Sequence, residues 1–293
     1  LCMSALLDDG DEILIPSPDY PLWTACATLA GGKAVHYICD EQSEWYPDID
    51  DMRSKITDKT KAIVIINPNN PTGYLYTQKE MNQIRDIVKK YDLFLFSDEV
   101  YREFCYTGAP YISAFHLKGI ENNVVLVDSV SKRYSECGIR IGALITKNQM
   151  VKENVMKWCQ ARLSPPLIGQ IIAEASLDTP NDYMLNVYNE YVERRKFLID
   201  GLNRIPGCYS PIPMGAFYTV VKLPVDDADK FQQWLLEEFD DAGETVMFAP
   251  GASMYRTPGK GKNEVRMAYV IESHKIERAM DILKKAIEVY NAK

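Results

Sequence analysis

The segment from Val124 to Gly142 holds the residues best suited to covalent chemistry. It reads Val-Val-Leu-Val-Asp-Ser-Val-Ser-Lys-Arg-Tyr-Ser-Glu-Cys-Gly-Ile-Arg-Ile-Gly, so Lys132 follows an apolar run and stands near two serines. A lysine acts as a nucleophile only after it loses its proton, which partial burial and cationic neighbours favour. Ser129, Ser131 and Arg140 carry the hydroxyl and guanidinium groups that typically surround a phosphate. The pattern suits a covalent bond between Lys132 and an aldehyde that bears a phosphate. For this segment taken alone, a surface lysine after a strand is the commoner alternative.

A rigid turn and a buried carboxylate are expected where two other apolar runs end. The turn Asn67-Pro-Asn-Asn-Pro-Thr-Gly73 contains two Asn-Pro pairs, which would hold the Asn70 amide in place to donate to a ligand oxygen. Asp98, in Ser97-Asp-Glu-Val-Tyr-Arg102, stands where a lone carboxylate is costly unless a cation such as a protonated pyridine nitrogen compensates it. Tyr101 lies on the same face if this segment is helical. A helix N-cap is the structural alternative for Asp98.

Two further residues are candidates for ligand contact. Tyr20, in Pro16-Ser-Pro-Asp-Tyr-Pro21, offers a flat ring for stacking on an aromatic cofactor, with simple packing as the alternative. Arg266 lies within the strand-like segment Glu264-Val-Arg-Met-Ala-Tyr269, an unusual place for an arginine. Its planar guanidinium suits a carboxylate ligand, and a buried structural ion pair is the alternative.

Composition and charge narrow the class of protein. The chain has 293 residues, 46% of them apolar and 25% charged, which suits a globular protein of two domains. Its net charge of −8 argues against nucleic acid and anionic membranes as partners. No apolar run approaches the roughly 18 residues that span a bilayer. Seven scattered cysteines and three distant histidines predict reduced thiols, a cytoplasmic location and no metal site.

The first half of the chain predicts an α/β domain that positions these side chains. Strand-like runs at 12–15, 34–38, 62–66, 93–96, 124–127 and 142–145 alternate with helical patterns at 20–30, 78–90 and before Trp158. This alternation predicts a mostly parallel central sheet with helices on both faces. Ligands of such sheets bind beyond the carboxyl ends of the strands, where the candidate residues stand.

The second half predicts a smaller α+β domain attached to a long helix. A helix is expected over 181–203, followed by strands over 216–223, 245–249 and 264–270 and helices over 228–240 and 275–289. We therefore expect a large cofactor-binding domain over residues 1–180 and an interdomain helix with a small domain over 181–293. Leu1 to Gly10 predicts the last turns of a helix that a glycine ends. With no initiator Met or signal peptide, we expect a fragment that begins inside an element.

Three motifs of this chain, in their order, resemble those of the class I/II pyridoxal phosphate-dependent aminotransferases of fold type I. They are N-P-x-N-P-T-G, D-E-V-Y and S-x-S-K-x-x-x-x-x-G-x-R-x-G. The resemblance runs from Gly10 to the C-terminus. It implies that Lys132 binds pyridoxal 5'-phosphate covalently and moves the substrate α-proton. It also implies that Asp98 pairs with the ring nitrogen, that Asn70 and Tyr101 hold the ring oxygen, and that Tyr20 stacks on the ring. By the same resemblance, Ser129, Ser131 and Arg140 bind the phosphate. Arg266 then binds the substrate α-carboxylate.

The resemblance implies transamination between an amino acid and a 2-oxo acid in a cytoplasmic homodimer, with aspartate and 2-oxoglutarate as the first expectation. Asp128–Gly142 and Arg162–Gln170 look most like bacterial aspartate aminotransferases, whereas Pro18–Asp48 looks more like glutamate–pyruvate (alanine) aminotransferases. Arg162 is a candidate for a distal carboxylate, with a helix-end arginine as the alternative. A C–S lyase and an effector-sensing regulator domain are further alternatives with the same fold.

Two features that members of this family usually have are absent from this sequence. Members usually have a Gly/Ser-rich turn, whose backbone amides contact the phosphate, and an N-terminal arm that reaches across a dimer. We expect both to lie in a missing N-terminal part. Pro213–Tyr218 and Pro250–Tyr255 resemble family loops that cover the site, and closure of the small domain on the substrate is expected.

Overall fold

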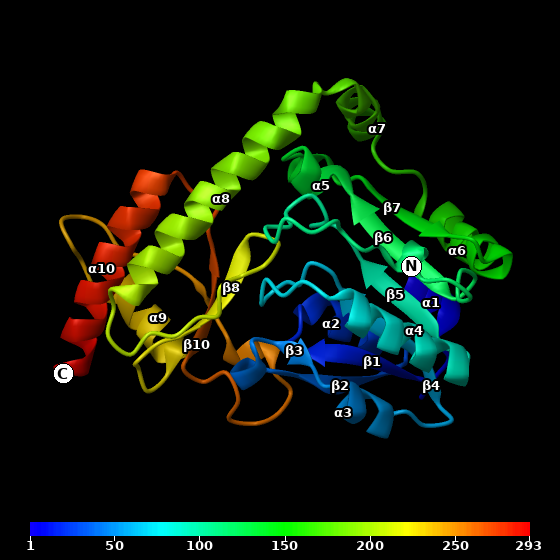
Figure 1. Ribbon diagram of the computed structural model, residues 1–293, viewed down its shortest axis with the longest axis horizontal. Helices are drawn as coiled ribbons and strands as arrows, with labels where there is room; N and C mark the ends of the chain where they lie inside the picture. The colour runs from blue at the N-terminus through cyan, green and yellow to red at the C-terminus, as the bar shows by residue number, and fades with distance from the viewer.

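Two β-sheets and a long helix that leads from the first to the second form the framework of the molecule (Figure 1). The computed structural model describes residues 1–293. The larger sheet has seven strands in the order β3-β2-β1-β4-β5-β6-β7, and the smaller has three in the order β8-β10-β9. Helix α8 (Asn181–Asn203) runs along the molecule from the end of the first half to the smaller sheet (Figure 1). The prediction of a boundary at residue 180 stays a prediction.

The larger sheet is mostly parallel, as predicted. Strands β1, β2, β4, β5 and β6 run parallel, while β3 and β7 pair antiparallel at the two edges. The bounds of its strands are β1 Glu12–Ser17, β2 Lys33–Asp40, β3 Tyr46–Pro47, β4 Thr60–Ile66, β5 Phe94–Asp98, β6 Val124–Ser129 and β7 Gly142–Thr146. The helices that accompany it are α1 Cys2–Leu6, α2 Pro21–Leu29, α3 Ile49–Ser54, α4 Gln78–Tyr91, α5 Val130–Arg133, α6 Gln149–Arg162 and α7 Leu167–Ala175.

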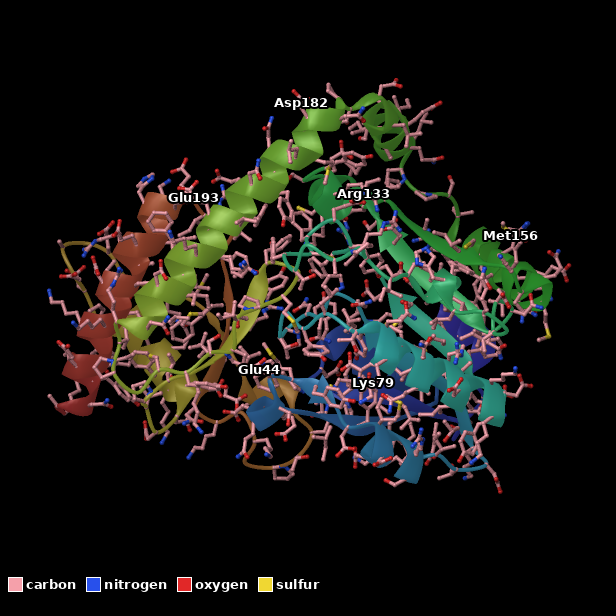
Figure 2. The ribbon with its side chains drawn as sticks, in the orientation of Figure 1. Glu44, Lys79, Arg133, Met156, Asp182 and Glu193 are labelled. Atoms are coloured by element: carbon pink, nitrogen blue, oxygen red, sulfur yellow. The ribbon has the colours of Figure 1, made fainter.

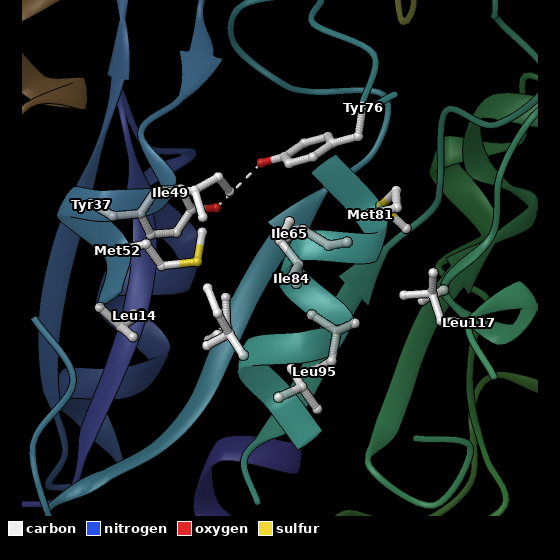
Figure 3. Packing of buried hydrophobic residues seen from close by; sticks show 14 of the residues in the cluster. Leu14, Tyr37, Ile49, Met52, Ile65, Tyr76, Met81, Ile84, Leu95 and Leu117 are labelled. Carbon is white, nitrogen blue, oxygen red and sulfur yellow. Dashed lines mark hydrogen bonds between the residues drawn. The ribbon is translucent and has the colours of Figure 1, made fainter. Parts of the chain in front are cut away.

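Alternating strand side chains bury both faces of this sheet. In β4, Ile63 and Ile65 pack into the layer formed by α3 and α4 (Figure 3), whereas Val64 and Ile66 pack into the layer formed by α1, α2 and α6. Period-two alternation explains why neighbours on one strand enter different layers. Each fully buried isoleucine contributes about 1.5–3 kcal/mol, so both layers stabilise the sheet and the loops at its carboxyl edge.

Helix α4 shows how local sequence sets an element of this layer. Thr77 and Glu80 form a reciprocal capping box at its start, and Asp92 ends it in a left-handed conformation. Met81, Ile84 and Val88 repeat every three or four residues and are buried against the sheet. The helix therefore follows from sequence alone, and the observed bounds lie within one residue of the prediction.

The smaller sheet is antiparallel and packs against three helices. Its strands are β8 Tyr218–Lys222, β9 Ala249–Pro250 and β10 Glu264–Ala268. Side chains of α8, α9 (Ala228–Glu237) and α10 (Ser273–Asn291) form one apolar core with it. The outer side of α8 is polar, with Asp182 and Glu193 pointing away from the body of the molecule (Figure 2). No helix combines the length and apolarity needed to cross a membrane.

Several predicted element bounds were wrong. Residues 245–248 are not a strand, because the Phe248 amide donates to Gln232 Oε1 at 2.8 Å and the Thr245 hydroxyl donates to the Leu235 carbonyl at 2.8 Å. Contacts with α9 thus replace a strand ladder. Helix α9 also ends at Glu237 rather than at 240.

The first helix also ends earlier than predicted. It stops at Leu6 because Leu7 is extended, with φ −108° and ψ 134°. Gly10 instead occupies a turn with φ +81° and donates its amide to the Gly31 carbonyl. Helix α7 had no counterpart among the predicted elements.

Candidate active site

A cavity of about 270 Å³ lies where the carboxyl ends of β4, β5 and β6 face β8 and β10 (Figure 1). The residues predicted to hold the cofactor and the substrate α-carboxylate all line it, although they come from segments far apart in sequence: Tyr20, Asn70, Asp98, Tyr101, Ser129, Ser131, Lys132, Arg140 and Arg266. Ile66, Val100, Cys137 and Tyr218 complete the wall and were not predicted. The structure thus gathers these residues at the edge expected for ligands of an α/β sheet.

Lys132 stands on α5, the short helix that follows β6. The Ser129 hydroxyl caps this helix by accepting from the Ser131 amide at 3.1 Å, and it also donates to the Ile141 carbonyl at 2.7 Å. The half-buried Lys132 amine forms no ion pair and lies 5.9 Å from the centre of the Phe217 ring. No carboxylate therefore occupies the Lys132 amine, which leaves its nitrogen open to a ligand in the cavity.

Asp98 ends β5 with its carboxylate beside the cavity. Burial raises the pKa of Asp98 to about 6. Hydrogen bonds from the Val100 amide and the Trp23 side chain lower this pKa, but they do not offset burial. The nearby Asp128 and Glu99 carboxylates raise it further. No cationic side chain pairs with it, so a protonated ring nitrogen in the cavity would meet an unpaired carboxylate. Sequence reasoning missed Trp23, whose ring also packs on Phe96.

The segment after Asp98 is a series of turns rather than a helix. The Arg102 amide donates to the Glu99 carbonyl at 3.1 Å and the Phe104 amide to the Tyr101 carbonyl at 2.9 Å. Helix capping is therefore wrong for Asp98, and Tyr101 does not reach the cavity through helical periodicity. It reaches the cavity through consecutive turns that bring its hydroxyl within 3.5 Å of Asn70 Nδ2.

A hydrogen-bonded chain connects the two sheets across the cavity. Arg266 Nη1 donates to Asn70 Oδ1 at 3.1 Å, and Asn70 Nδ2 lies 3.5 Å from the Tyr101 hydroxyl. The half-buried Arg266 guanidinium also lies over the Tyr218 ring, 4.7 Å from its centre. It pairs with no carboxylate, so the alternative of a structural ion pair is wrong. Its remaining N–H groups suit a carboxylate ligand.

Two serines and an arginine lie together at the other end of the cavity. The Ser129 and Ser131 hydroxyl oxygens are 2.6 Å apart. Arg140 is exposed, has a left-handed backbone with φ +59°, and donates through Nη1 to the Cys137 carbonyl at 2.7 Å. Its other N–H groups remain open, so the three side chains present several donors to an anion.

Arg162 lies outside this cavity. It ends α6, is exposed, and lines a larger groove of about 860 Å³ that shares Asp98, Ser129, Ser131 and Arg140 with the cavity. Arg162 therefore lies at a helix end, as the alternative interpretation held. The cations around the cavity itself are Lys132, Arg140 and Arg266.

These groups fit pyridoxal 5'-phosphate. Lys132 offers a free amine for the aldehyde, and Asp98 offers an unpaired carboxylate for a protonated ring nitrogen. Asn70 and Tyr101 offer polar groups for a ring oxygen, and Arg140 with the two serines offers donors for a phosphate. Each part of the cofactor thus has a chemically complementary group in one cavity.

Comparison with known proteins agrees with this geometry. The model of the family described as aminotransferase class I and II matches residues 1–282. The chain belongs to the class I and II aminotransferases. Members of this family use pyridoxal phosphate as cofactor. The resemblance drawn from the three motifs is confirmed.

Several relatives of this aminotransferase chain carry alanine-type names. Glutamate-pyruvate aminotransferase AlaA of Haemophilus influenzae is 38% identical over 237 residues, which are 77% of this chain and 57% of that protein. Alanine aminotransferase of Mycobacterium tuberculosis is 39% identical over 251 residues, which are 81% of this chain and 57% of that protein. The chain thus spans less than two thirds of the length of these relatives.

Solved structures confirm the fold class. An alanine aminotransferase from Pyrococcus furiosus superposes with a TM-score of 0.88 at 36% identity, covering 98% of this chain and 73% of its own. An aspartate aminotransferase from Thermus thermophilus with maleate reaches a TM-score of 0.87 at 25% identity, covering 97% of this chain and 72% of its own. The central sheet with helices on both faces is therefore the aminotransferase fold.

Proposed function

We propose that this chain is the catalytic part of an enzyme that transfers an amino group between an amino acid and a 2-oxo acid. The observation that carries the proposal is the cavity shared by an unpaired lysine, Lys132, and an unpaired arginine, Arg266, with Asp98 at its base. Bound pyridoxal phosphate supplies an aldehyde and an electron-withdrawing ring. Asp98 would keep the ring nitrogen protonated, and Asn70 and Tyr101 would hold the ring oxygen. Tyr20 would lie against the ring, and Ser129, Ser131 and Arg140 would hold the phosphate.

Arg266 and Lys132 divide the work on the substrate. The Arg266 guanidinium binds the α-carboxylate with the N–H groups that Asn70 leaves free, which orients the bond from the α-carbon to its hydrogen. The Lys132 amine takes the proton from the α-carbon and later returns it, so one base serves both directions. Phe217, beside the Lys132 amine, presents an apolar surface that limits water near this nitrogen.

Alanine is the amino donor that we propose, with pyruvate as its 2-oxo acid. Names and identities of the relatives support alanine over the aspartate expected first from the sequence. The charges around the cavity also support alanine. Its single carboxylate needs one arginine, which Arg266 supplies. The second carboxylate of aspartate would need another cation, and the candidate Arg162 lies outside the cavity. A small apolar side chain leaves no distal charge to neutralise.

An amino-donor panel on the full-length protein tests this function. With 2-oxoglutarate as acceptor, we expect kcat/KM for alanine to exceed that for aspartate at least about tenfold, a difference of about 1.4 kcal/mol in transition-state binding. Arg266→Ala should lower kcat/KM for every donor by about 30-fold or more, whereas Arg162→Ala should leave alanine turnover unchanged. A higher value for aspartate would reject alanine as the donor. Ammonia release without an acceptor would indicate a C–S lyase instead.

We also propose a homodimer built on the α6–α7 face. Leu163, Leu167, Ile168 and Ile171 are 72%, 71%, 73% and 56% exposed. Such a dense apolar surface marks a protein interface more often than a solvated face. Leu163 also lines the groove that reaches Ser129 and Arg140, so a second copy on this face would approach the phosphate end of the site.

A further inference from the structure

Tyr218 is the one aromatic residue of the cavity to which neither the motifs nor the proposed function assign a role. It begins β8 and is half-buried in the cavity wall. In the register of the small sheet Val220 faces Arg266 directly, so Tyr218 is the diagonal neighbour of Arg266 on the same face. This position explains why the Arg266 guanidinium lies 4.7 Å from the centre of the Tyr218 ring.

The Tyr218 side chain also contacts the pair that faces the ring oxygen. Its ring meets the Tyr101 ring edge-on, with centres 5.7 Å apart and planes at 90°. Burial raises the pKa of Tyr101 above its ordinary value, and the neighbouring Tyr218 side chain raises it further. Tyr101, Asn70, Arg266 and Tyr218 therefore form a closed circuit of neighbouring contacts.

The backbone before Tyr218 is held by both halves of the molecule. Ala216 has a left-handed conformation with φ +57°, and its carbonyl accepts from the Tyr106 hydroxyl at 2.6 Å and the Tyr269 hydroxyl at 3.1 Å. The loop of Asn70 also packs here, since a side chain at Gly73 would lie 2.7 Å from the Tyr218 carbonyl. A strained residue kept by two buried hydroxyls indicates that the direction of the following side chains matters.

We propose that Tyr218 is a positioning residue that couples substrate-carboxylate recognition to the ring-oxygen contacts of the cofactor. Its ring face orients the Arg266 guanidinium towards the cavity, and its hydroxyl competes with the cofactor for the Tyr101 proton. This inference rests on the proposed function. The ring of Tyr218 acts on Arg266 and its hydroxyl acts on Tyr101, so two substitutions can separate the two effects.

Tyr218→Leu removes the ring, and Tyr218→Phe removes only the hydroxyl. Both variants are compared with wild type in full-length protein loaded with pyridoxal phosphate, by titrating propionate, a carboxylate without an amine, against the cofactor absorbance. Tyr218→Leu is expected to weaken propionate binding about tenfold, as loss of a desolvated cation–π contact requires, while Tyr218→Phe binds within about twofold of wild type. Methoxyamine, which attacks the cofactor aldehyde and has no carboxylate, should react equally fast with all three proteins at a pH well below their absorbance midpoints.

The hydroxyl has its own spectroscopic readout. Without Tyr218 as a competing acceptor, Tyr101 donates fully to the anionic ring oxygen, so the pH midpoint of the cofactor absorbance in Tyr218→Phe should fall by about half a unit or more. A merely structural tyrosine would not move this midpoint. An unchanged midpoint overturns the hydroxyl half of the proposal.

Tyr209→Leu is the matched control, because Tyr209 is an exposed tyrosine whose backbone pairs with Lys222 of β8 outside the cavity. If it weakens propionate binding as much as Tyr218→Leu, or if Tyr218→Leu binds like wild type, Tyr218 does not position Arg266. Wild-type protein that neither takes up the cofactor nor transaminates would instead reject the proposed function, so the two failures are distinct.

Discussion

At the scale of single residues, Asp98 shows how the fold prepares a site at a cost in stability. Burial raises its pKa from 3.8 to about 6, so ionised Asp98 destabilises the cofactor-free fold. Because the folded pKa is the higher one, the stability that Asp98 contributes is complete below about pH 4 and is lost as the pH rises through about 6. A protonated ring nitrogen beside it would offset this loss.

Asp98→Asn tests this account of the site. Asparagine cannot ionise, so the free energy of unfolding of the cofactor-free protein should rise by about 1–3 kcal/mol at pH 8 and stay unchanged near pH 4. Asparagine also cannot keep a ring nitrogen protonated, so kcat should fall by about 100-fold or more. Denaturant unfolding at the two pH values and steady-state kinetics measure both effects. Equal stabilisation at pH 4 and pH 8 would contradict the role of ionisation.

At the scale of elements, α5 is too short to hold Lys132 by itself. Four residues cannot form a stable isolated helix, so tertiary contacts must fix it. Asp128, at the end of β6, accepts from the Ser129 amide at 2.8 Å and pairs with Arg133 of α5 (Figure 2) at 3.0 Å and with Arg102 at 2.8 Å. This buried carboxylate ties the strand, the helix and the turn after Asp98 together.

Asp128→Ala should therefore loosen the segment that presents Lys132 and the two serines. Removing one partner of a buried ion-pair network costs about 3–5 kcal/mol, and we expect a lower free energy of unfolding and weaker cofactor binding. Asp50→Ala is the matched control, since the Asp50–Arg53 pair is exposed and its loss should cost less than about 1 kcal/mol. Denaturant unfolding and cofactor titration measure the two losses. Similar losses in both variants would show that Asp128 has no special role.

At the scale of the whole molecule, the apolar α6–α7 face predicts self-association. Ile168→Glu introduces a charge into the centre of the proposed interface and should convert a dimer into monomers, because an unpaired charge cannot be buried there. Sedimentation of the full-length protein measures the change. Leu29→Glu, at an 88% exposed position on α2, is the control and should remain dimeric. A dimer that survives Ile168→Glu would place the interface elsewhere.

The sequence by itself predicted most of the elements and the site residues that the motifs contain. Thr77 and Glu80 cap α4, apolar spacing marks its buried face, and continuous apolar strands predict a parallel sheet covered on both sides. These features are local, so they can be predicted without tertiary contacts. The motifs also located the residues from Tyr20 to Arg266 that line the cavity, while their individual roles stay predictions.

Only the tertiary structure decided how these residues meet. Residues 245–248 follow a strand pattern, yet hydrogen bonds to α9 keep them out of the sheet. Tyr101 reaches the cavity through turns, Arg266 bonds to Asn70 across 196 positions of sequence, and Tyr218 joins both through the register of β8 with β10. Arg162, one candidate for a distal carboxylate, stands outside the cavity at the end of α6. Such contacts depend on strand register and on turns between distant segments, which no local pattern of residues encodes.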